Sequence, residues 1–451
     1  MTTTRPNTDG VPGLLSYQDV LDLDTREVPA HIRTPSRGTF DFLEAPIDQY
    51  VSREWHEREK ERLWKRVWQM ACREEEIPEV GDHVVYRIAG LSYLIVRSAP
   101  DTIRAFPNAC LHRGRQLKDF DGRCAEIRCP FHAMTWDLDG ELSRIPAPWE
   151  FEHVDPARFA LPQVSVGTWG GWVFVNPDPD AEPLERFLGE LPEQFAKWDM
   201  ANRYVEVHVS KLLRCNWKVA QEAFMECWHA AATHPQTLPY AAFGVCQVDV
   251  YDNFARFITP SEVAGPMMPG SPTEEEKLRA TMDVRVDEDL PVDLEPGETA
   301  RSFVVRSTRE KWRGFLGDRI EEWADCELVD NFTYTIFPNL MPWGGVHKIC
   351  YRFRPNGDDH RTCLMEVFYL SPFAGERPPP AAEVALGFDD PYSGVPALGS
   401  VGNILDQDCA NMEKVQYGLE TTAKRTVTFA SYQEDNLRWM QRLLRRYLEG
   451  E

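Results

Sequence analysis

The chain has 451 residues, of which 43% are hydrophobic, and a formal net charge of −23. This size and composition exclude a disordered tail or a small disulfide-stapled peptide and favour two or three globular domains. The negative charge argues against nucleic acid and anionic membranes as partners, and no apolar run approaches the roughly 20 residues that cross a bilayer. Eleven scattered cysteines, and a first stretch without the pattern of a secretion signal, predict a cytoplasmic protein.

The predicted elements begin with an N-terminal arm. Residues 52–72 place Trp55, Leu63 and Trp68 among charged residues, which predicts an amphipathic helix with Ser52 near its N-cap. We expect residues 1–79 to form an arm and helix that pack on the larger domain. Residues 80–180 then change to short strand-like runs joined by glycine-containing turns, which predicts a small all-β domain.

The remaining residues, 181–451, predict a second domain with both helices and strands. A helical stretch at 216–236 is interrupted by Pro235, and the acidic segment 271–298 is typical of a surface excursion or lid. Alternating runs predict strands at 331–340, 347–355 and 363–372, and apolar residues at helical spacing predict a closing helix. The fold class is therefore α+β, with a mostly antiparallel sheet.

The first group of potential metal ligands lies in the small domain. Cys110-x-His112 and Cys129-x2-His132 are separated by sixteen residues. Zinc would accept these ligands, but zinc fingers usually keep their cysteines together and their histidines together. Two loops that each offer one thiolate and one imidazole suit a [2Fe–2S] cluster in which one iron takes both thiolates and the other both imidazoles.

Around these ligands, the sequence CLHRG, CPFH and GGWVFVNPDP resembles the Rieske domain of the Rieske non-haem iron oxygenases. The resemblance implies that Cys110, His112, Cys129 and His132 bind a Rieske [2Fe–2S] cluster. The family commonly reads Gly-Trp-x-Tyr after CPFH, whereas this chain has Ala-Met-Thr-Trp at 133–136. None of these residues is a ligand, so the departure concerns the surroundings of the cluster.

A second group of potential ligands has the pattern Glu226-x2-His229-x4-His234. On a regular helix the two histidines would be rotated by about 140° from each other. They can face one metal only if the helix ends or distorts between them, and Pro235 predicts such an ending. Two imidazoles and one carboxylate form the facial triad of non-haem Fe(II) oxygenases. The candidate carboxylates are Asp406 and Asp408.

Residues 200–451 resemble the catalytic domain of the same oxygenases, through NWK at 216–218, TIFPN at 335–339 and an aspartate four residues before Met412. This selects Asp408 as the third ligand of a mononuclear Fe(II), with Asp406 as the runner-up. It also implies a helix-grip fold, an antiparallel sheet around a long helix. The carboxylate that bridges the two metal centres, usually aspartate, corresponds to Glu226; a helix-face acid paired with a nearby base is the alternative.

The resemblance implies the terminal oxygenase component of a multicomponent system. It would use O2, and electrons from a separate ferredoxin or flavin reductase, to mono- or dihydroxylate an aromatic or other hydrophobic substrate. The subunits would form head-to-tail homotrimers, with or without a β subunit. Oxidative demethylation is the alternative reaction, and an electron carrier or a zinc-binding module are alternatives of other classes. Candidate pocket walls are Phe224, Trp228, Phe332, Met341 and Trp343.

Overall fold

The computed structural model describes residues 16–284 and 294–450. Its β-rich part contains three small sheets. The first has the strand order β5-β4-β3-β6, the second β10-β11-β2 and the third β7-β8-β9. The strands are β2 (Gln69–Arg73), β3 (Asp82–Ile88), β4 (Leu91–Ala99), β5 (Thr102–Pro107), β6 (Gly122–Arg123), β7 (Ile127–Arg128), β8 (Thr135–Trp136), β9 (Leu142–Arg144), β10 (Ser165–Trp169) and β11 (Trp172–Asn176).

The helix predicted from Ser52 onward is shorter than the sequence suggested. Ser52 caps α4 (Arg53–Glu59) through its side chain, as predicted, and a π-helical turn continues to Trp64. The following residues instead form β2, which pairs with β11. All five residues of β2 are buried, so the strand lacks the alternation that would have distinguished it from a helix.

The larger part is built on an eight-stranded sheet with the order β13-β14-β15-β16-β17-β18-β12-β19. Its pairings are antiparallel, as predicted, except that the edge strand β19 runs parallel to β12. The strands are β12 (Arg203–Leu213), β13 (Gln247–Val250), β14 (Phe254–Thr259), β15 (Asn331–Ile336), β16 (Leu340–Pro342), β17 (Ile349–Asn356), β18 (Asp359–Pro372) and β19 (Val384–Leu386). A separate pair joins β1 (Glu44–Pro46) to β20 (Thr426–Thr428).

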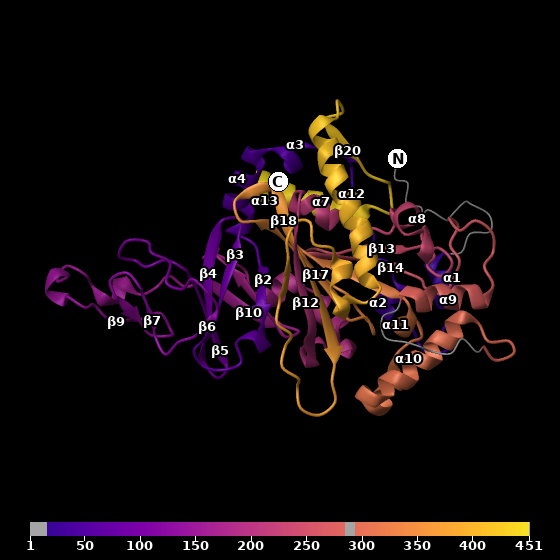
Figure 1. Cartoon of the computed structure of the whole chain (residues 1–451), viewed down its shortest axis with the longest axis horizontal. Coiled ribbons are helices and arrows are strands. Elements are labelled where there is room, and N and C mark those ends of the chain that lie inside the picture. The colour runs from indigo at the N-terminus through magenta and orange to yellow at the C-terminus, as the bar shows by residue number, and fades with distance from the viewer. Residues whose placement is uncertain (1–15, 285–293, 451) are drawn as a thin grey trace.

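Helices pack against this sheet and position the candidate ligands. The helix α7 contacts β17 and β18, α13 contacts β13 and β14, and the long α12 lies against α7 (Figure 1). The helices are α1 (Tyr17–Leu21), α2 (Ala30–Arg33), α3 (Asp48–Val51), α4, α5 (Leu184–Leu188), α6 (Leu191–Gln194), α7 (Trp217–Glu222), α8 (Ala230–Thr233), α9 (Glu274–Val284), α10 (Ala300–Leu316), α11 (Cys326–Val329), α12 (Val401–Thr421) and α13 (Asp435–Glu449).

The two parts share one hydrophobic core, which extends from β2 and β11 into the large sheet. A second, smaller core with Phe106, Leu117 and Trp136 lies in the β-rich part, around Cys110 and Cys129. The described N-terminal residues pack on the larger part, where the Tyr17 hydroxyl donates to Asp330 at 3.0 Å. In the acidic segment 271–298, α9 is described, whereas residues 285–293 lie outside the described residues. Among the described helices, none combines the length and apolar character needed to span a bilayer.

Candidate metal centres

The segment that carries the two predicted histidine ligands is not a continuous helix. After α7 ends at Glu222, the chain turns before the four-residue helix α8. His229 stands at the N-cap of α8 and His234 at its C-cap, where φ −124° and ψ 56° leave helical geometry. Pro235 then begins a 3₁₀ turn. The predicted helix ending at Pro235 is confirmed, and it removes the rotation that a regular helix would impose on the pair.

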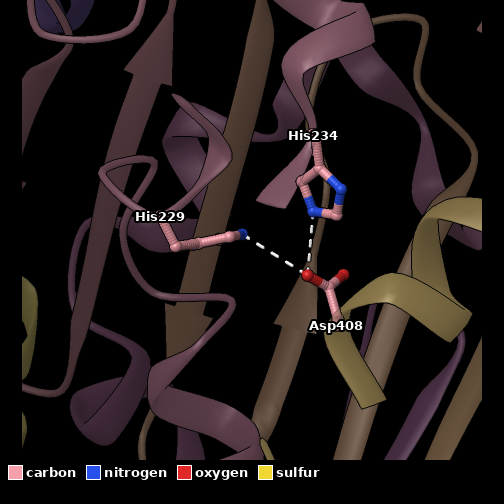
Figure 2. A group of neighbouring side chains, drawn as sticks. All are labelled: His229, His234 and Asp408. Carbon is pink, nitrogen blue, oxygen red and sulfur yellow. Dashed lines mark hydrogen bonds and ion pairs between the residues drawn. The ribbon is translucent and has the colours of Figure 1, made fainter. Parts of the chain in front are cut away.

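His229, His234 and Asp408 converge from two separate segments of the chain. One potential ligand atom from each lies within 4.8 Å of the other two, and no other group of three such residues was found in residues 16–284 and 294–450. Nε2 of His234 lies 2.8 Å from Asp408 Oδ1, and Nε2 of His229 lies 3.5 Å from the same oxygen. Figure 2 shows both imidazoles directed toward the carboxylate that α12 supplies.

The group is mostly withdrawn from solvent. The side chains of His234 and Asp408 are 7% and 4% exposed, whereas that of His229 is 27% exposed. Burial acts to lower the pKa of His229, but the hydrogen bond to Glu226 and the negative charges of Glu226 and Asp408 outweigh it, and the pKa is raised. The arrangement therefore offers a partly accessible position beside a buried carboxylate.

Each histidine is held by its other ring nitrogen. Glu226 Oε1 lies 2.7 Å from Nδ1 of His229, and Oε2 accepts from the His229 backbone N–H at 3.0 Å. On the other ligand, Gln407 Oε1 lies 2.7 Å from Nδ1 of His234 and also accepts from the Gln236 amide at 2.8 Å. Because both partners are acceptors, Nδ1 carries the proton in each neutral ring and the Nε2 lone pair is free to bind a metal.

Asp406, the runner-up for the carboxylate ligand, faces a different part of the fold. Its two oxygens accept from the backbone N–H groups of Tyr392 and Ser393 at 2.7 and 3.1 Å. Asp406 therefore anchors a turn, and Asp408 is the aspartate that the structure brings to the histidines. Asn411, one turn further along α12, donates to Thr233 at 3.0 Å and joins the two segments.

An aromatic group lies close to the converged ligands. Phe224 is 4.8 Å from Tyr351 and 5.6 Å from Phe353 between ring centroids, and Trp343 is 6.3 Å from Tyr351. Burial raises the pKa of Tyr351 well above its usual range, and the charges of Tyr369 and Asp408 add to the rise. The Tyr351 phenol is thus within electrostatic reach of Asp408. Sequence reasoning missed Tyr351 because nothing in its local pattern distinguishes it from a core strand residue.

Three further residues are predicted pocket walls. Phe332 and Met341 are fully buried, and Phe332 packs on Trp198. Trp228 is 47% exposed beside His229, so it lies at the surface rather than in the core. Gln407 and Gln236 are further residues that the sequence did not reveal, since isolated glutamines carry no ligand pattern.

The four predicted cluster ligands lie on two adjacent loops of the β-rich part. In one loop, the Gly114 N–H donates to Cys110 O at 2.8 Å, and in the other the Ala133 N–H donates to Cys129 O at 3.0 Å. Ala133 adopts a φ of +60°, the left-handed conformation that glycine adopts most easily. The family usually has glycine at this position, where the turn favours glycine. In this chain Ala133 adopts the same left-handed conformation and still closes the turn.

The arrangement of these four side chains fits a two-iron group. Cys110 and Cys129 are buried and interact with each other, since burial and the hydrogen bond with Cys129 both raise the pKa of Cys110. The rings of His112 and His132 lie 4.7 Å apart. Sulfur and nitrogen ligands are paired separately, as a Rieske cluster needs.

An unpartnered nitrogen supports the same conclusion. Nδ1 of His112 is buried, and within the described part of the chain it has no hydrogen-bond partner. Burial, and then the positive charges of His132 and Arg113, lower the pKa of His112, which keeps the ring neutral and able to bind a metal. A buried imidazole nitrogen without a partner is costly unless another group occupies it.

The two centres lie at opposite ends of the molecule. Figure 1 places β7 and β9, which belong to the small sheet that carries the loop with Cys129 and His132, at the far left, and α8 on the right beyond the large sheet. Exposed apolar residues surround the cluster end: Phe131 is 56% exposed and Trp149 69% exposed. Within one chain, the cluster loops therefore do not reach the histidine–carboxylate group.

A small β domain with paired cysteines and paired histidines, together with a sheet-and-helix domain that gathers two histidines and one aspartate, defines an iron-dependent oxygenase with its own iron–sulfur domain. Family models agree with this class. Residues 195–450 match the ring hydroxylating alpha subunit (catalytic domain), and residues 67–158 match the Rieske [2Fe-2S] domain. The chain belongs to the Rieske non-haem iron oxygenases, as an alpha subunit with a Rieske cluster and a mononuclear iron.

Several curated proteins are similar to part of the chain. The carnitine monooxygenase oxygenase subunit of Escherichia coli is 32% identical over 198 residues, which are 42% of this chain and 52% of that protein. The glycine betaine monooxygenase oxygenase subunit of Pseudomonas aeruginosa is 29% identical over 194 residues, 43% of this chain and 45% of that protein. The 2-aminobenzenesulfonate 2,3-dioxygenase subunit alpha of Alcaligenes sp is 32% identical over 189 residues, 40% and 47% of the two chains. The chain thus matches about half the length of these relatives.

A crystal structure of a quaternary ammonium Rieske monooxygenase has a TM-score of 0.63 with this chain at 17% sequence identity, and the match covers 92% of this chain and 100% of that one. At this identity the likeness shows the fold alone. The predicted α+β fold, with a Rieske domain and a helix-grip catalytic domain, is confirmed.

Proposed function

We propose that this protein is the terminal oxygenase component of a Rieske system that oxidises a quaternary ammonium compound. The observation that carries the oxygenase assignment is the convergence of His229, His234 and Asp408 within 4.8 Å. The carnitine and glycine betaine monooxygenase subunits among its relatives support the substrate class. The predicted alternative, oxidative demethylation, is therefore favoured over the main prediction of aromatic hydroxylation, which the comparisons do not confirm.

We assign Cys110, His112, Cys129 and His132 to the Rieske cluster, and His229, His234 and Asp408 to the mononuclear iron. When bound by these two imidazoles and the carboxylate, an Fe(II) would supply the chemistry that activates O2. The chain's own residues orient the two imidazoles, since Glu226 and Gln407 fix the protonated nitrogen of each ring. Asp408 supplies a negative charge in a buried setting.

Phe224 and Trp343, the two partly exposed members of the aromatic group, support a cationic substrate. Aromatic faces attract a trimethylammonium group within about 6 Å of the ring centroid, and the attraction is strongest where water is excluded. Hydroxylation of a carbon bonded to the quaternary nitrogen would be followed by cleavage of the C–N bond. The nitrogen keeps the bonding electron pair, the hydroxylated carbon leaves as a carbonyl group, and the hydroxyl proton passes to water.

Electron delivery requires a second subunit. The separation of the two centres within one chain (Figure 1) and the exposed apolar side chains at the cluster end support a head-to-tail homotrimer. In that assembly, His132 or His112 of one subunit would face Glu226 of the next. A separate ferredoxin or flavin reductase would supply the electrons. We also propose the division into residues 1–79, 80–180 and 181–451, with β2 crossing from the first into the sheet of the second.

Aromatic dihydroxylation is the second candidate, because the similarity to the 2-aminobenzenesulfonate dioxygenase alpha subunit matches that of the carnitine enzyme in identity. The purified protein with a surrogate reductase should be offered carnitine, glycine betaine and 2-aminobenzenesulfonate under ¹⁸O₂. We expect O2 uptake with a quaternary ammonium substrate and one labelled oxygen in the product. Two labelled oxygens in an aromatic diol would instead establish the second candidate.

The control variant is His229→Ala, which should abolish O2 uptake with every substrate. The electron paramagnetic resonance signal of the reduced cluster should persist, because its ligands lie on other loops. Simultaneous loss of both would contradict two separate centres. NADH oxidation by the purified chain alone would contradict the need for a reductase.

A further inference from the structure

Two cysteines beside the candidate iron site are in unusually close contact. Sγ of Cys227 and Sγ of Cys246 lie 2.7 Å apart, and the residues are only 5% and 2% exposed. Non-bonded heavy atoms normally prefer separations of roughly 3.5–4.0 Å, and a disulfide bond is about 2.0 Å long. The two sulfurs are therefore closer than ordinary packing requires, and a small movement would bring them to bonding distance.

The position of this pair in the chain gives the contact its significance. Cys227 directly follows Glu226 and precedes His229 by two residues, whereas Cys246 directly precedes β13. The segment between the two cysteines contains His229 and His234. A bond between the sulfurs would close this segment into a loop that holds both histidines of the candidate iron site.

Both sulfurs are buried, and the hydrogen bond with Cys246, followed by burial, raises the pKa of the Cys227 thiol well above its usual range. Besides each other, the sulfurs have polar oxygen neighbours: Gln433 Oε1 lies 3.6 Å from Sγ of Cys227, and Thr259 Oγ1 lies 3.3 Å from Sγ of Cys246. Trp228 is 47% exposed and the His229 side chain 27% exposed. A small oxidant in the solvent therefore reaches Trp228, the residue that directly follows Cys227.

We propose that Cys227 and Cys246 are a redox modification site, which hydrogen peroxide converts to a disulfide that closes the histidine-bearing segment. One sulfur attacks the O–O bond of peroxide and becomes a sulfenic acid, while the departing oxygen takes up a proton and leaves as water. The second sulfur then displaces the hydroxyl group, which leaves as another water. Two electrons pass from the sulfurs to peroxide, and the two thiol hydrogens end in the two waters.

The chain contains a matched internal control. Cys215 and Cys363 are also fully buried, but their sulfurs lie 3.9 Å apart, an ordinary packing distance. Cys363 lies in β18, opposite Leu213 of β12, and Cys215 follows the end of β12 by two residues, so neither belongs to the segment between Cys227 and Cys246. Both pairs are buried. If only Cys227 and Cys246 are oxidised, the cause is therefore their shorter sulfur–sulfur distance or their position beside the exposed Trp228, and not burial.

The direct test is peroxide treatment of the holoenzyme without substrate, followed by thiol alkylation, denaturation, digestion and mass spectrometry. We expect a peptide that links Cys227 to Cys246, with loss of two hydrogen atoms, and its disappearance after dithiothreitol. Cys215 and Cys363 should be recovered as alkylated thiols. Recovery of Cys227 and Cys246 as alkylated thiols, or equal cross-linking of both pairs, overturns the proposal.

Variants and a second measurement test the consequence for the segment. Cys246→Ser should prevent the cross-link, whereas Cys215→Ser should leave it in place. Hydrogen exchange of the amides between the two cysteines should slow on oxidation and recover on reduction, because loop closure removes open conformations. Unchanged exchange in the oxidised wild-type protein would show that the bond does not constrain the histidines. Neither readout depends on substrate turnover, so failure of the proposed function would leave both results interpretable.

Discussion

Gln407 joins the two segments of the candidate iron site through His234, with its Oε1 2.7 Å from the Nδ1 of the imidazole. Gln407 is also the residue directly before Asp408, so one turn of α12 supplies both the carboxylate and the group that orients a histidine. The Gln236 amide donates to the same Oε1 at 2.8 Å. This second donor identifies the Gln407 oxygen as an acceptor and fixes the ring with Nε2 unprotonated.

Replacement of Gln407 by leucine should weaken Fe(II) binding. The variant loses the acceptor for His234 Nδ1–H, so the ring can rotate or change tautomer. Loss of such partners of a metal-binding histidine typically lowers metal affinity or activity by about 10–100-fold. Anaerobic titration of the mononuclear site with Fe(II) measures the change, and the visible spectrum of the cluster should stay as in the wild type.

The control for this prediction is Gln407→Glu, which keeps an acceptor oxygen at nearly the same position. Its Fe(II) affinity should stay closer to wild type than that of the leucine variant. Equal affinities in the leucine variant and the wild type would show that Gln407 does not orient His234.

The two aspartates of α12 provide a second, paired prediction. Asp408→Ala should remove the mononuclear iron, because the carboxylate lies 2.8 and 3.5 Å from the two imidazoles. Asp406→Ala should retain the iron but lose two hydrogen bonds to the backbone at Tyr392 and Ser393, at about 1–3 kcal/mol of unfolding free energy. Metal analysis and urea denaturation separate the two outcomes. Iron loss in the Asp406 variant but not in the Asp408 variant would show that Asp406, rather than Asp408, is the iron ligand.

Glu226 should affect electron transfer more than metal binding. Glu226→Gln keeps an acceptor for His229 Nδ1–H but removes the negative charge, so the iron should stay bound. If Glu226 bridges to the neighbouring subunit's cluster, reoxidation of the reduced cluster by O2 in the presence of substrate should slow by about 10–100-fold. Stopped-flow absorbance of the cluster follows this rate. A rate equal to wild type would leave Glu226 as an orienting group for His229 only.

How far the sequence predicted the molecule depended on the sequence separation of the interacting residues. The predicted cluster ligands lie within one short stretch, so their spacing indicated a metal site, and the family resemblance assigned the cluster to them. His234 and Asp408 are 174 residues apart, and no local pattern connects them; the family resemblance selected Asp408, and the fold then brought it to the histidines. Gln407 remained unrecognised because an exposed glutamine on a helix has no distinguishing pattern.

The strand β2 illustrates the corresponding limit for the fold. Residues 69–73 continue an amphipathic helical pattern, yet they pair with β11 and are buried on both faces. A strand between two layers shows no alternation, so periodicity cannot separate it from a helix. These residues form a strand because they pair with β11, about a hundred residues further along the chain. Local propensity does not encode such a long-range contact.

Glu222, the last residue of α7, gives the chain a specific pH dependence. It is partly buried, accepts from the Tyr50 hydroxyl at 2.9 Å and from Gln441 at 2.9 Å, and burial raises its pKa from 4.5 to about 7. Between these two values the folded state holds a proton that the unfolded state has released. The contribution of this group to stability is therefore present below pH 4.5 and is lost as the pH rises to about 7.

Removing this titration should flatten the pH profile. At about 1.4 kcal/mol per pH unit, the wild type should lose about 3 kcal/mol of unfolding free energy relative to Glu222→Gln between pH 4.5 and 7. Urea denaturation of both proteins at pH 5 and pH 8 measures the difference, and other titrating groups cancel in the comparison. A free-energy difference between the two proteins that is the same at both pH values would show that Glu222 ionises normally in the folded chain. The helix α7 leads directly into the segment with Glu226 and His229. Iron retention by the wild type should therefore also fall as the pH rises from 4.5 to 7, and this fall should be smaller in Glu222→Gln.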